Sequence, residues 1–505
     1  MIIAGAIIYL CCEISFYLVY LYHIKKSADD LSKRVSQPYH DYGNERAKLM
    51  KRIWDRMEDT CRLTGEDFPS NLYIYFSRWF HSLPKEGETA PLLLCDHDTK
   101  KERDSFSFVP GEKDSGTQLF LEAVTSFMAW AFFDSKVEDL DELWQKEQLE
   151  MMLNLVSSTI VEHTNTLPSA PEKKPFQARR MTLEKVNPIF KPLFVYVLFW
   201  IIRQIGHLAL LYMGFDRHQI IIKRDGSKAD SAMTYWYRAA QHNSIGSKKP
   251  IMFFHGISPG GLTLYLPWLQ KVVLRGNFFW GGDSNYQNPV FLFENEPITC
   301  KWTFDALTET ETVHAVHNAL ARHGFGSSKD KDLTLLGHSF GSFQLTWMLR
   351  SRLRSRINQF ILLDPVSILL SEPDVVLNFL YGRGADEALV GESFPRSILI
   401  RLFFSSEIFI ENYLRRHFAW YNSELWLEDI PDHVDTTIYV ALKDEIYNAH
   451  KVGIEVQRIN DKRSRTKSKL IKLRKWHGYG HGACLALPSM WREVSQKIHG
   501  EKTNH

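Results

Sequence analysis

The pentapeptide Gly337-His338-Ser339-Phe340-Gly341 holds a serine between two glycines. The apolar run Leu-Thr-Leu-Leu precedes it and an amphipathic run follows, so the serine lies between a predicted strand and a predicted helix. This is the context of a nucleophile elbow, a sharp turn that exposes the hydroxyl. Glycines are expected there because side chains two positions from a strained serine would clash. A role as a helix N-cap would also explain Ser339. The prediction of a nucleophile therefore depends on whether the rest of the chain supplies the other parts of a catalytic site.

A general base for this serine is expected late in the chain, after the last strand. The stretch Trp-His-Gly-Tyr-Gly-His-Gly-Ala offers His477 and His481. His481 is preferred because it follows the last predicted strand and precedes the predicted final helix. A single late histidine could also be an ordinary surface or core residue. His481 is selected only because it follows the candidate serine and the candidate acid in the order that a catalytic triad would need.

The acid that orients the histidine should fall between the serine and the histidine in the sequence. The run Thr-Ile-Tyr-Val-Ala-Leu ends at a predicted strand end followed by Lys-Asp-Glu, which makes Asp444 the first choice and Glu445 the second. Asp364 ends the preceding predicted strand and is interpreted as a structural residue or turn cap, with a role as the acid left as an alternative. The predicted order is therefore Ser339, Asp444, His481.

Backbone N–H groups that stabilise a developing oxyanion are the remaining requirement. One is expected from Phe340, directly after the nucleophile. The sequence Pro-Ile-Met-Phe-Phe-His-Gly-Ile-Ser-Pro-Gly-Gly places His255, Gly256 and Ile257 in a glycine-rich loop after an earlier predicted strand. We expect the Ile257 N–H to be the second donor, although an ordinary Gly-Pro turn would give the same pattern.

Alternating strand-like and helix-like runs predict an α/β fold from residue 219 onward. Eight strand-like runs can be counted, and their alternation with helices predicts a mostly parallel eight-stranded sheet with helices on both faces. The predicted core covers residues 219–366 and 432–500. Between them, residues 367–431 are rich in Phe, Trp, Tyr, Leu and Ile at helical spacing, which predicts a helical cap over the strand ends that lines an apolar pocket, or a satellite core.

The N-terminal part of the chain has a different character. Residues 27–180 are predicted to be a mainly helical region. A polar, turn-rich loop is predicted at residues 83–116 and a linker at residues 166–177.

Two segments are apolar enough to meet a membrane. Ile2–Tyr22 carries one acid, Glu13, has no basic residue before it, and is followed by Lys25 and Lys26. Its length suits a transmembrane helix, and the lysines favour a single-pass anchor (residues 1–26) with a cytosol-facing body. A buried core helix is the alternative. An endomembrane of the endoplasmic-reticulum type is the expected location.

The second apolar segment, residues 188–215, is interrupted by Arg203, Gln204 and His207. An arginine near the centre of a bilayer is costly, so an interfacial helix, or one packed on the body, is favoured over a second span.

Composition limits the function further. The net charge of +2 over 505 residues gives no indication of nucleic-acid binding. The six cysteines have no metal-like or dense disulfide spacing, and the sequence has no Asn-x-Ser/Thr site, which agrees with a cytosol-facing body. Neither a metal nor an organic cofactor is expected.

The motifs HGISPGG, LLGHSFGS, LKDE and GYGHGACL resemble the alpha/beta-hydrolase superfamily of the AB hydrolase-1 type, over roughly residues 219–500. The wider chain resembles membrane-anchored, largely uncharacterised members from fungi, algae and other microbial eukaryotes. The matching stretches are RWFHSL, MAWAFF, KPLFVYVLFWIIRQIGHLALLYMGF, LDPVSILLSEPDVVLNFLY and RRHFAWYNSELWLEDIP. This resemblance implies the fold and the roles of Ser339, Asp444 and His481, and it implies no particular substrate.

The function predicted is a membrane-anchored serine hydrolase that cleaves carboxylic esters, with an apolar ester or acyl lipid as substrate and membrane lipids as partners. Acyl transfer to an alcohol by the same residues is an alternative that differs only in the acceptor. A catalytically silent scaffold on the same fold is another.

Overall fold

The structure is a computed structural model that describes residues 2–33, 45–82, 115–161, 176–224, 230–240, 249–275, 288–326, 332–381 and 400–500. Most of the predicted polar loop at 83–116 and of the predicted linker at 166–177 lies outside the described residues, as do residues 382–399 of the predicted cap.

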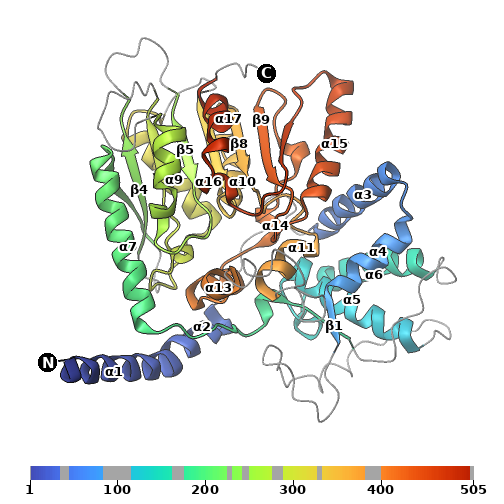
Figure 1. Cartoon of the computed structure of the whole chain (residues 1–505). Coiled ribbons are helices and arrows are strands. Elements are labelled where there is room, and N and C mark those ends of the chain that lie inside the picture. The colour runs from blue at the N-terminus through green and yellow to red at the C-terminus, as the bar shows by residue number, and fades with distance from the viewer. Residues whose placement is uncertain are drawn as a thin grey trace.

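Eight strands form one sheet in the order β10-β9-β8-β7-β5-β6-β4-β3 (Figure 1). Strands β5 to β10 run parallel, while β3 and β4 make an antiparallel edge. The strands are β3 Asp216–Ile222, β4 Ser231–Arg238, β5 Ile251–Phe254, β6 Val290–Phe293, β7 Leu333–His338, β8 Ile357–Leu363, β9 Asp435–Ala441 and β10 Lys472–Trp476. The prediction of a mostly parallel eight-stranded sheet is confirmed.

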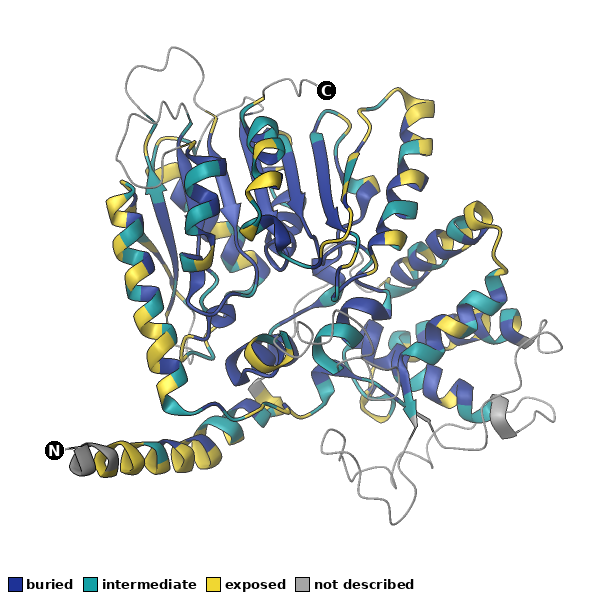
Figure 2. Cartoon of the chain, in the orientation of Figure 1, coloured by how far each residue is buried: buried dark blue, intermediate teal, exposed yellow. Residues whose placement is uncertain are grey.

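Alternating side chains divide the interior into two cores, because successive residues of a strand point to opposite faces. In β5, Ile251 and Phe253 belong to one core, and Met252 and Phe254 belong to the other. Both faces are covered by helices, as predicted, and the central strands between them are buried, while the edge strands β3 and β10 are partly exposed (Figure 2). The first core includes α7 Leu193–Tyr212, α8 Leu266–Trp268 and α17 Pro488–His499, and the second includes α9 Glu309–Arg322, α10 Gly341–Arg350 and α15 Ala449–Thr466.

The chain between β8 and β9 lies across the carboxyl ends of the strands (Figure 1). Its described helices are α11 Pro373–Val376, η9 Leu377–Tyr381, η10 Arg401–Ser405, α13 Ile408–Arg416, α14 Trp420–Ser423 and η11 Leu427–Asp429. Side chains from this segment join the larger of the two cores, so the segment is a packed layer of the fold.

The N-terminal helices pack into the same core beside this layer. They are α3 Arg46–Thr64, α4 Phe68–Arg78, α5 Ser115–Phe133 and α6 Leu143–Val161. A two-stranded antiparallel sheet joins β1 Phe80–Ser82 to β2 Phe176–Ala178. This sheet was not predicted, since three residues are too few to show the period of a strand.

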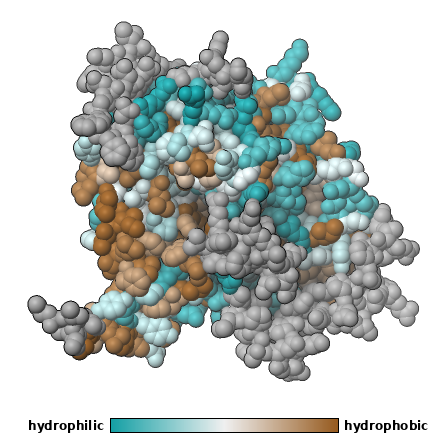
Figure 3. Space-filling view, viewed as in Figure 1, coloured by the Kyte–Doolittle hydropathy of each residue, from teal (hydrophilic) through white to brown (hydrophobic). Residues whose placement is uncertain are grey.

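Two helical stretches in the described part are long and apolar enough to cross a membrane, Ile7–Asp29 and Leu193–Tyr212. The first overlaps α1 Ile2–Val19, which projects from the body, and the second is α7, which lies along it (Figure 1). Hydrophobic side chains gather on the outer surface over α7 (Figure 3). The Glu13 carboxylate accepts hydrogen bonds from the N–H groups of Leu193 and Phe194, at 2.9 and 3.2 Å, so the acid of α1 caps the first turn of α7.

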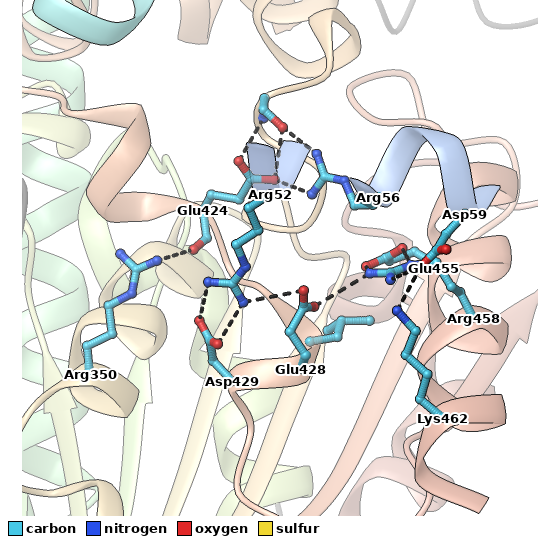
Figure 4. A network of polar contacts seen from close by, with 12 residues as sticks. Arg52, Arg56, Asp59, Arg350, Glu424, Glu428, Asp429, Glu455, Arg458 and Lys462 are labelled. Carbon is cyan, nitrogen blue, oxygen red and sulfur yellow. Dashed lines mark hydrogen bonds and ion pairs between the residues drawn. The ribbon is translucent and has the colours of Figure 1, made fainter. Parts of the chain in front are cut away.

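Ion pairs attach helix α3 to the layer between β8 and β9 (Figure 4). The buried Arg56 guanidinium donates to Glu424 at 2.6 Å, and Arg52 donates to both oxygens of Asp429 at 2.7 and 3.2 Å. Both arginines also lie over the ring of Trp426. The N-terminal region is therefore held to the rest of the fold by paired charges as well as by apolar contacts.

We expect Arg56→Ala to lower the free energy of unfolding by about 3–5 kcal/mol, because it leaves the fully buried Glu424 carboxylate without its cation. Urea denaturation measures the loss. Lys51→Ala on the same helix is the matched control, since its ion pair with Asp55 is exposed and contributes little. Equal stability of both variants would contradict the importance of the buried pair.

Candidate active site

Ser339 lies in the turn between β7 and α10 with a φ of 51°, a left-handed conformation that is uncommon outside glycine. Its N–H donates to the Leu363 carbonyl of the neighbouring strand at 2.9 Å. A Cβ on Gly341 would come within 2.1 Å of the Phe254 carbonyl oxygen, so this position has no room for a side chain. The local geometry is that of the predicted nucleophile elbow.

A continuous hydrogen-bond chain joins the three residues that the sequence singled out. The Ser339 hydroxyl lies 2.7 Å from His481 Nε2, and His481 Nδ1 lies 2.6 Å from Asp444 Oδ2. An ionised Asp444 can only accept, which assigns the imidazole hydrogen to Nδ1 and leaves Nε2 free to accept the serine proton. The other Asp444 oxygen accepts the N–H groups of Ile446 and Tyr447 at 2.8 and 3.2 Å, which fixes the carboxylate.

The pKa of His481 is shifted by opposing effects. Burial lowers it, but the charge of Asp444 and the hydrogen bond to that carboxylate, together with the charges of Asp364 and Glu445, outweigh burial, so the pKa is raised above its ordinary value. Glu445, the second choice for the acid, instead accepts the His481 backbone N–H at 2.9 Å. His477 is exposed just beyond the end of β10.

Asp364, the remaining alternative for the acid, is fully buried at the end of β8. Its carboxylate accepts the backbone N–H groups of Ala441 and Gly482, each at 2.9 Å, whereas Nδ1 of the His481 imidazole pairs with Asp444. Burial and the neighbouring Asp444 charge raise the pKa of Asp364 to about 6. The geometry therefore favours Asp444 as the partner of the histidine.

The loop after β5 approaches the serine from the other side. A Cβ on Gly256 would lie 2.8 Å from the Ser339 Cβ, so the glycine allows close contact. The Gly256 N–H donates to the Tyr265 hydroxyl at 2.8 Å, and that hydroxyl lies 2.9 Å from His338 Nδ1. Ile257 and Phe340, the predicted oxyanion donors, both line the pocket next to Ser339. Their role as donors stays a prediction.

His255 is a structural part of this loop. The buried ring donates from Nδ1 to the Gly256 carbonyl at 2.7 Å and accepts the Asn295 N–H at Nε2, at 3.1 Å. Burial lowers the pKa of His255, which agrees with a neutral imidazole. The imidazole therefore links the loop to the chain that follows β6.

Helix α7 packs on the body, which is one of the arrangements favoured from the sequence, and it supports the same loop from behind. The buried Arg203 guanidinium donates to the Thr299 carbonyl at 3.1 Å and to the Thr299 hydroxyl. That carbonyl also accepts the Gly260 N–H at 3.2 Å. Gly206 packs so closely on Thr263 that a side chain there would clash. The polar residue that interrupts the apolar segment thus faces the protein.

An apolar pocket of about 300 Å³ opens at Ser339 and His481. The layer between β8 and β9 supplies much of its wall, and Met181 and Leu264 add to it. Among the described lining residues, none is Asp, Glu, Lys or Arg. The wall from that layer consists of Leu370, Val375, Val376, Phe379, Leu380, Ile400, Phe404, Leu414 and Phe418.

Within the described residues, two groups of side chains lie close enough together to hold a metal ion, and Asp364 belongs to both. They are His338 with Asp364 and Cys484, and Asp364 with Asp444 and His481. In the second group the carboxylates and the imidazole are engaged in the hydrogen bonds described above. Those bonds account for the clustering without a metal ion.

No family model matches this chain, and no curated protein matches it. Similar solved structures include a bacterial membrane phospholipase A, with 13% identity over 61% of this chain and 92% of that chain at a TM-score of 0.37. An esterase from Thermogutta terrifontis has 13% identity over 56% and 97% at a TM-score of 0.38. A peroxisomal alpha-beta-hydrolase from Saccharomyces cerevisiae has 11% identity over 57% and 89% at a TM-score of 0.37. At these values the similarities carry no argument about activity, which must come from the site itself.

Gly341→Ala is expected to destabilise the protein by about 3 kcal/mol or more, because the new Cβ would overlap the Phe254 carbonyl and the backbone would have to move. Thermal denaturation measures the effect. Gly453→Ala in α15 serves as the control, since its Cβ would meet only ordinary contacts at 3.5 Å and alanine favours a helix by roughly 0.5–1 kcal/mol. A Gly341→Ala protein as stable as the wild type would contradict the close approach of α10 to β5.

Proposed function

We propose that this protein is a serine hydrolase that cleaves carboxylic esters, with Ser339 as nucleophile, His481 as general base and acid, and Asp444 as the orienting acid. The observation that carries the proposal is the hydrogen-bond chain through these three residues at the wall of an apolar pocket. An unrelated buried cluster would have no reason to place a strained serine, a correctly oriented imidazole and a carboxylate in this order.

In the proposed reaction, Ser339 Oγ attacks the ester carbonyl carbon while His481 Nε2 accepts the hydroxyl proton. The N–H groups of Ile257 and Phe340 would stabilise the resulting oxyanion. The tetrahedral intermediate collapses to an acyl-serine, and His481 returns the proton to the leaving alcohol. A water molecule then attacks the acyl-serine by the same steps and releases the acid. Asp444 stabilises the imidazolium in each half of the reaction.

The pocket supports an ester with an apolar acyl chain as the substrate. Since the described residues of the wall include no Asp, Glu, Lys or Arg, the wall favours hydrocarbon, which gains about 25 cal/mol for each Å² removed from water. These described residues offer no Lys or Arg to pair with a phosphate, so a charged head group would lie outside this part of the pocket. Acyl transfer would use the same residues with an alcohol in place of water, and added alcohol acceptors distinguish the two reactions.

Ser339→Ala is expected to abolish both ester hydrolysis and covalent labelling by a fluorophosphonate probe while the protein stays folded. Asp444→Asn should reduce kcat about 10⁴-fold, because an amide favours the wrong tautomer of His481. Hydrolysis of a short-chain chromogenic ester measures both. Wild-type protein that neither labels nor hydrolyses any ester would instead fit a catalytically silent scaffold, and full activity of Ser339→Ala would remove the nucleophile assignment.

We further propose that α1 anchors the protein in a membrane and that α7 lies in the interface with its outer side toward the lipid. The exposed side chains of α7 support this, since they are nearly all apolar while Arg203 faces inward. They are Phe194, Val197, Leu198, Trp200, Ile201, Ile205, Leu208, Leu211 and Tyr212. Lys25 and Lys26 favour a cytosolic body, and an endomembrane of the endoplasmic-reticulum type is proposed as its location.

Removing residues 1–26 is expected to weaken membrane attachment without abolishing it, because the outer side of α7 remains. The truncation should also lower stability, since Phe16 and Tyr20 are buried against the body and Glu13 caps α7. Carbonate extraction and thermal denaturation measure the two effects. A fully soluble truncated protein would remove the role of α7.

Protease treatment of intact microsomes tests the orientation of a protein with a C-terminal tag. A tag that is protected from the protease would overturn the cytosolic placement.

A further inference from the structure

Asp364 lies where three elements of the proposed site meet. It directly follows β8, is fully buried, and has a φ of 44°. The carbonyl of the preceding Leu363 accepts the Ser339 N–H at 2.9 Å, and the Asp364 N–H donates to the Tyr439 carbonyl of β9, also at 2.9 Å. The backbone at this point therefore connects the nucleophile elbow to the strand that carries the acid.

The Asp364 side chain extends this connection to the histidine loop. Oδ1 accepts the Ala441 N–H at 2.9 Å and the Tyr447 hydroxyl at 3.3 Å, and Oδ2 accepts the Gly482 N–H at 2.9 Å. Ala441 ends β9, and Gly482 directly follows His481. Both carboxylate oxygens accept hydrogen bonds. An asparagine at this position would therefore turn its side-chain NH₂ group toward one of these donors, from which an NH₂ group cannot accept a hydrogen bond.

The carboxylate also brings a second negative charge to the histidine. One polar atom from each of Asp364, Asp444 and His481 lies within 4.8 Å of the others. The Asp364 charge contributes to the raised pKa of His481, after the larger contribution of Asp444. The titratable groups facing Asp364 are Asp444, His481, Tyr447, Cys484 and His338.

We propose that Asp364 is a positioning residue of this site, which fixes the His481 loop to β9 and places a second carboxylate beside the imidazolium formed during the reaction. This inference rests on the proposed serine-hydrolase function. A role in positioning differs from the role of Asp444, whose carboxylate contacts the imidazole directly. It also differs from a turn cap, which would influence stability alone.

The test compares wild type and Asp364→Asn by ester hydrolysis over a range of pH. We expect kcat to fall on the order of 10- to 100-fold with little change in KM, because a displaced catalytic group lowers the rate without altering the pocket. We also expect the acidic limb of kcat/KM to move to lower pH. The base is neutral His481, and loss of a nearby negative charge lowers the pKa of His481, so the neutral form persists to lower pH.

Asp332→Asn is the matched control, since this buried carboxylate pairs with Arg356 just before β7, at the opposite end of that strand from Ser339. It should lower stability and leave the acidic limb in place. Tyr447→Phe removes a donor that stabilises the charged carboxylate, so it should raise the pKa of Asp364 further. Part of the negative charge beside His481 is then lost near neutral pH, and we expect a smaller shift of the acidic limb in the same direction. That variant carries the test if Asp364→Asn does not fold.

Three results would overturn the proposal. Folded Asp364→Asn with wild-type kcat and an unmoved acidic limb would leave Asp364 a turn cap. A loss of about 10⁴-fold in Asp364→Asn, beside a much smaller loss in Asp444→Asn, would make Asp364 the acid. If Asp364→Asn does not fold and the acidic limb of Tyr447→Phe coincides with that of the wild type, the proposal is also rejected. Fluorophosphonate labelling of the wild type distinguishes these results from failure of the proposed function. A wild-type protein that is not labelled would argue against the serine-hydrolase function, whereas the three results above concern the role of Asp364 alone.

Discussion

The left-handed backbone of Ser339 is the constraint on which the site depends. Such a conformation costs an L-residue roughly 1–3 kcal/mol and persists only where the surroundings determine it. Here the Ser339 N–H is held by the Leu363 carbonyl, and Gly341 lies against the Phe254 carbonyl with no space for a side chain. The neighbouring strands β5 and β8 thus fix the turn, and the parallel sheet brings their carboxyl ends to one edge.

Two carboxylates at that edge have different environments, and this separates their roles. Asp444 accepts two backbone N–H groups with one oxygen and the imidazole with the other. Asp364 is surrounded by backbone and hydroxyl donors, and burial together with the Asp444 charge raises its pKa to about 6. Pairs of carboxyl groups with unequal environments commonly divide their tasks in this way. In the proposed site, Asp444 orients His481, and Asp364 fixes the His481 loop to β9.

The sequence was sufficient to predict the sheet and to bring Ser339, Asp444 and His481 forward as candidates. Each candidate follows an apolar strand-like run, and their order agrees with one known arrangement of such residues. The same reasoning ranked Asp444 above Asp364 but kept Asp364 as an alternative acid, because both residues end a buried strand. Only the spatial distances to His481 and Gly482 distinguish them. Local sequence carries no information about contacts across more than a hundred residues.

Long separations also hid the meaning of two polar residues in apolar segments. Glu13 interrupts the first segment, yet its carboxylate caps α7, some 180 residues away. Arg203 interrupts the second, yet its guanidinium is bound to Thr299, 96 residues away. From the sequence, Arg203 already argued against a second membrane span, but the partner of neither residue could be identified. In the fold, each joins an apolar helix to the rest of the protein.

The Arg203 contact also bears on how α7 could meet a membrane. If α7 left the body to span a bilayer, Arg203 would lose Thr299 and enter hydrocarbon at a cost of at least about 2.5–3.5 kcal/mol. The glycine at 206 would lose its close contact with Thr263, and the loop that carries Ile257 would lose its support. A helix that stays on the body avoids these losses and still offers lipid its apolar outer side. In the proposed arrangement, the same helix therefore faces the membrane and supports the proposed oxyanion loop, which places the pocket close to the source of an apolar ester.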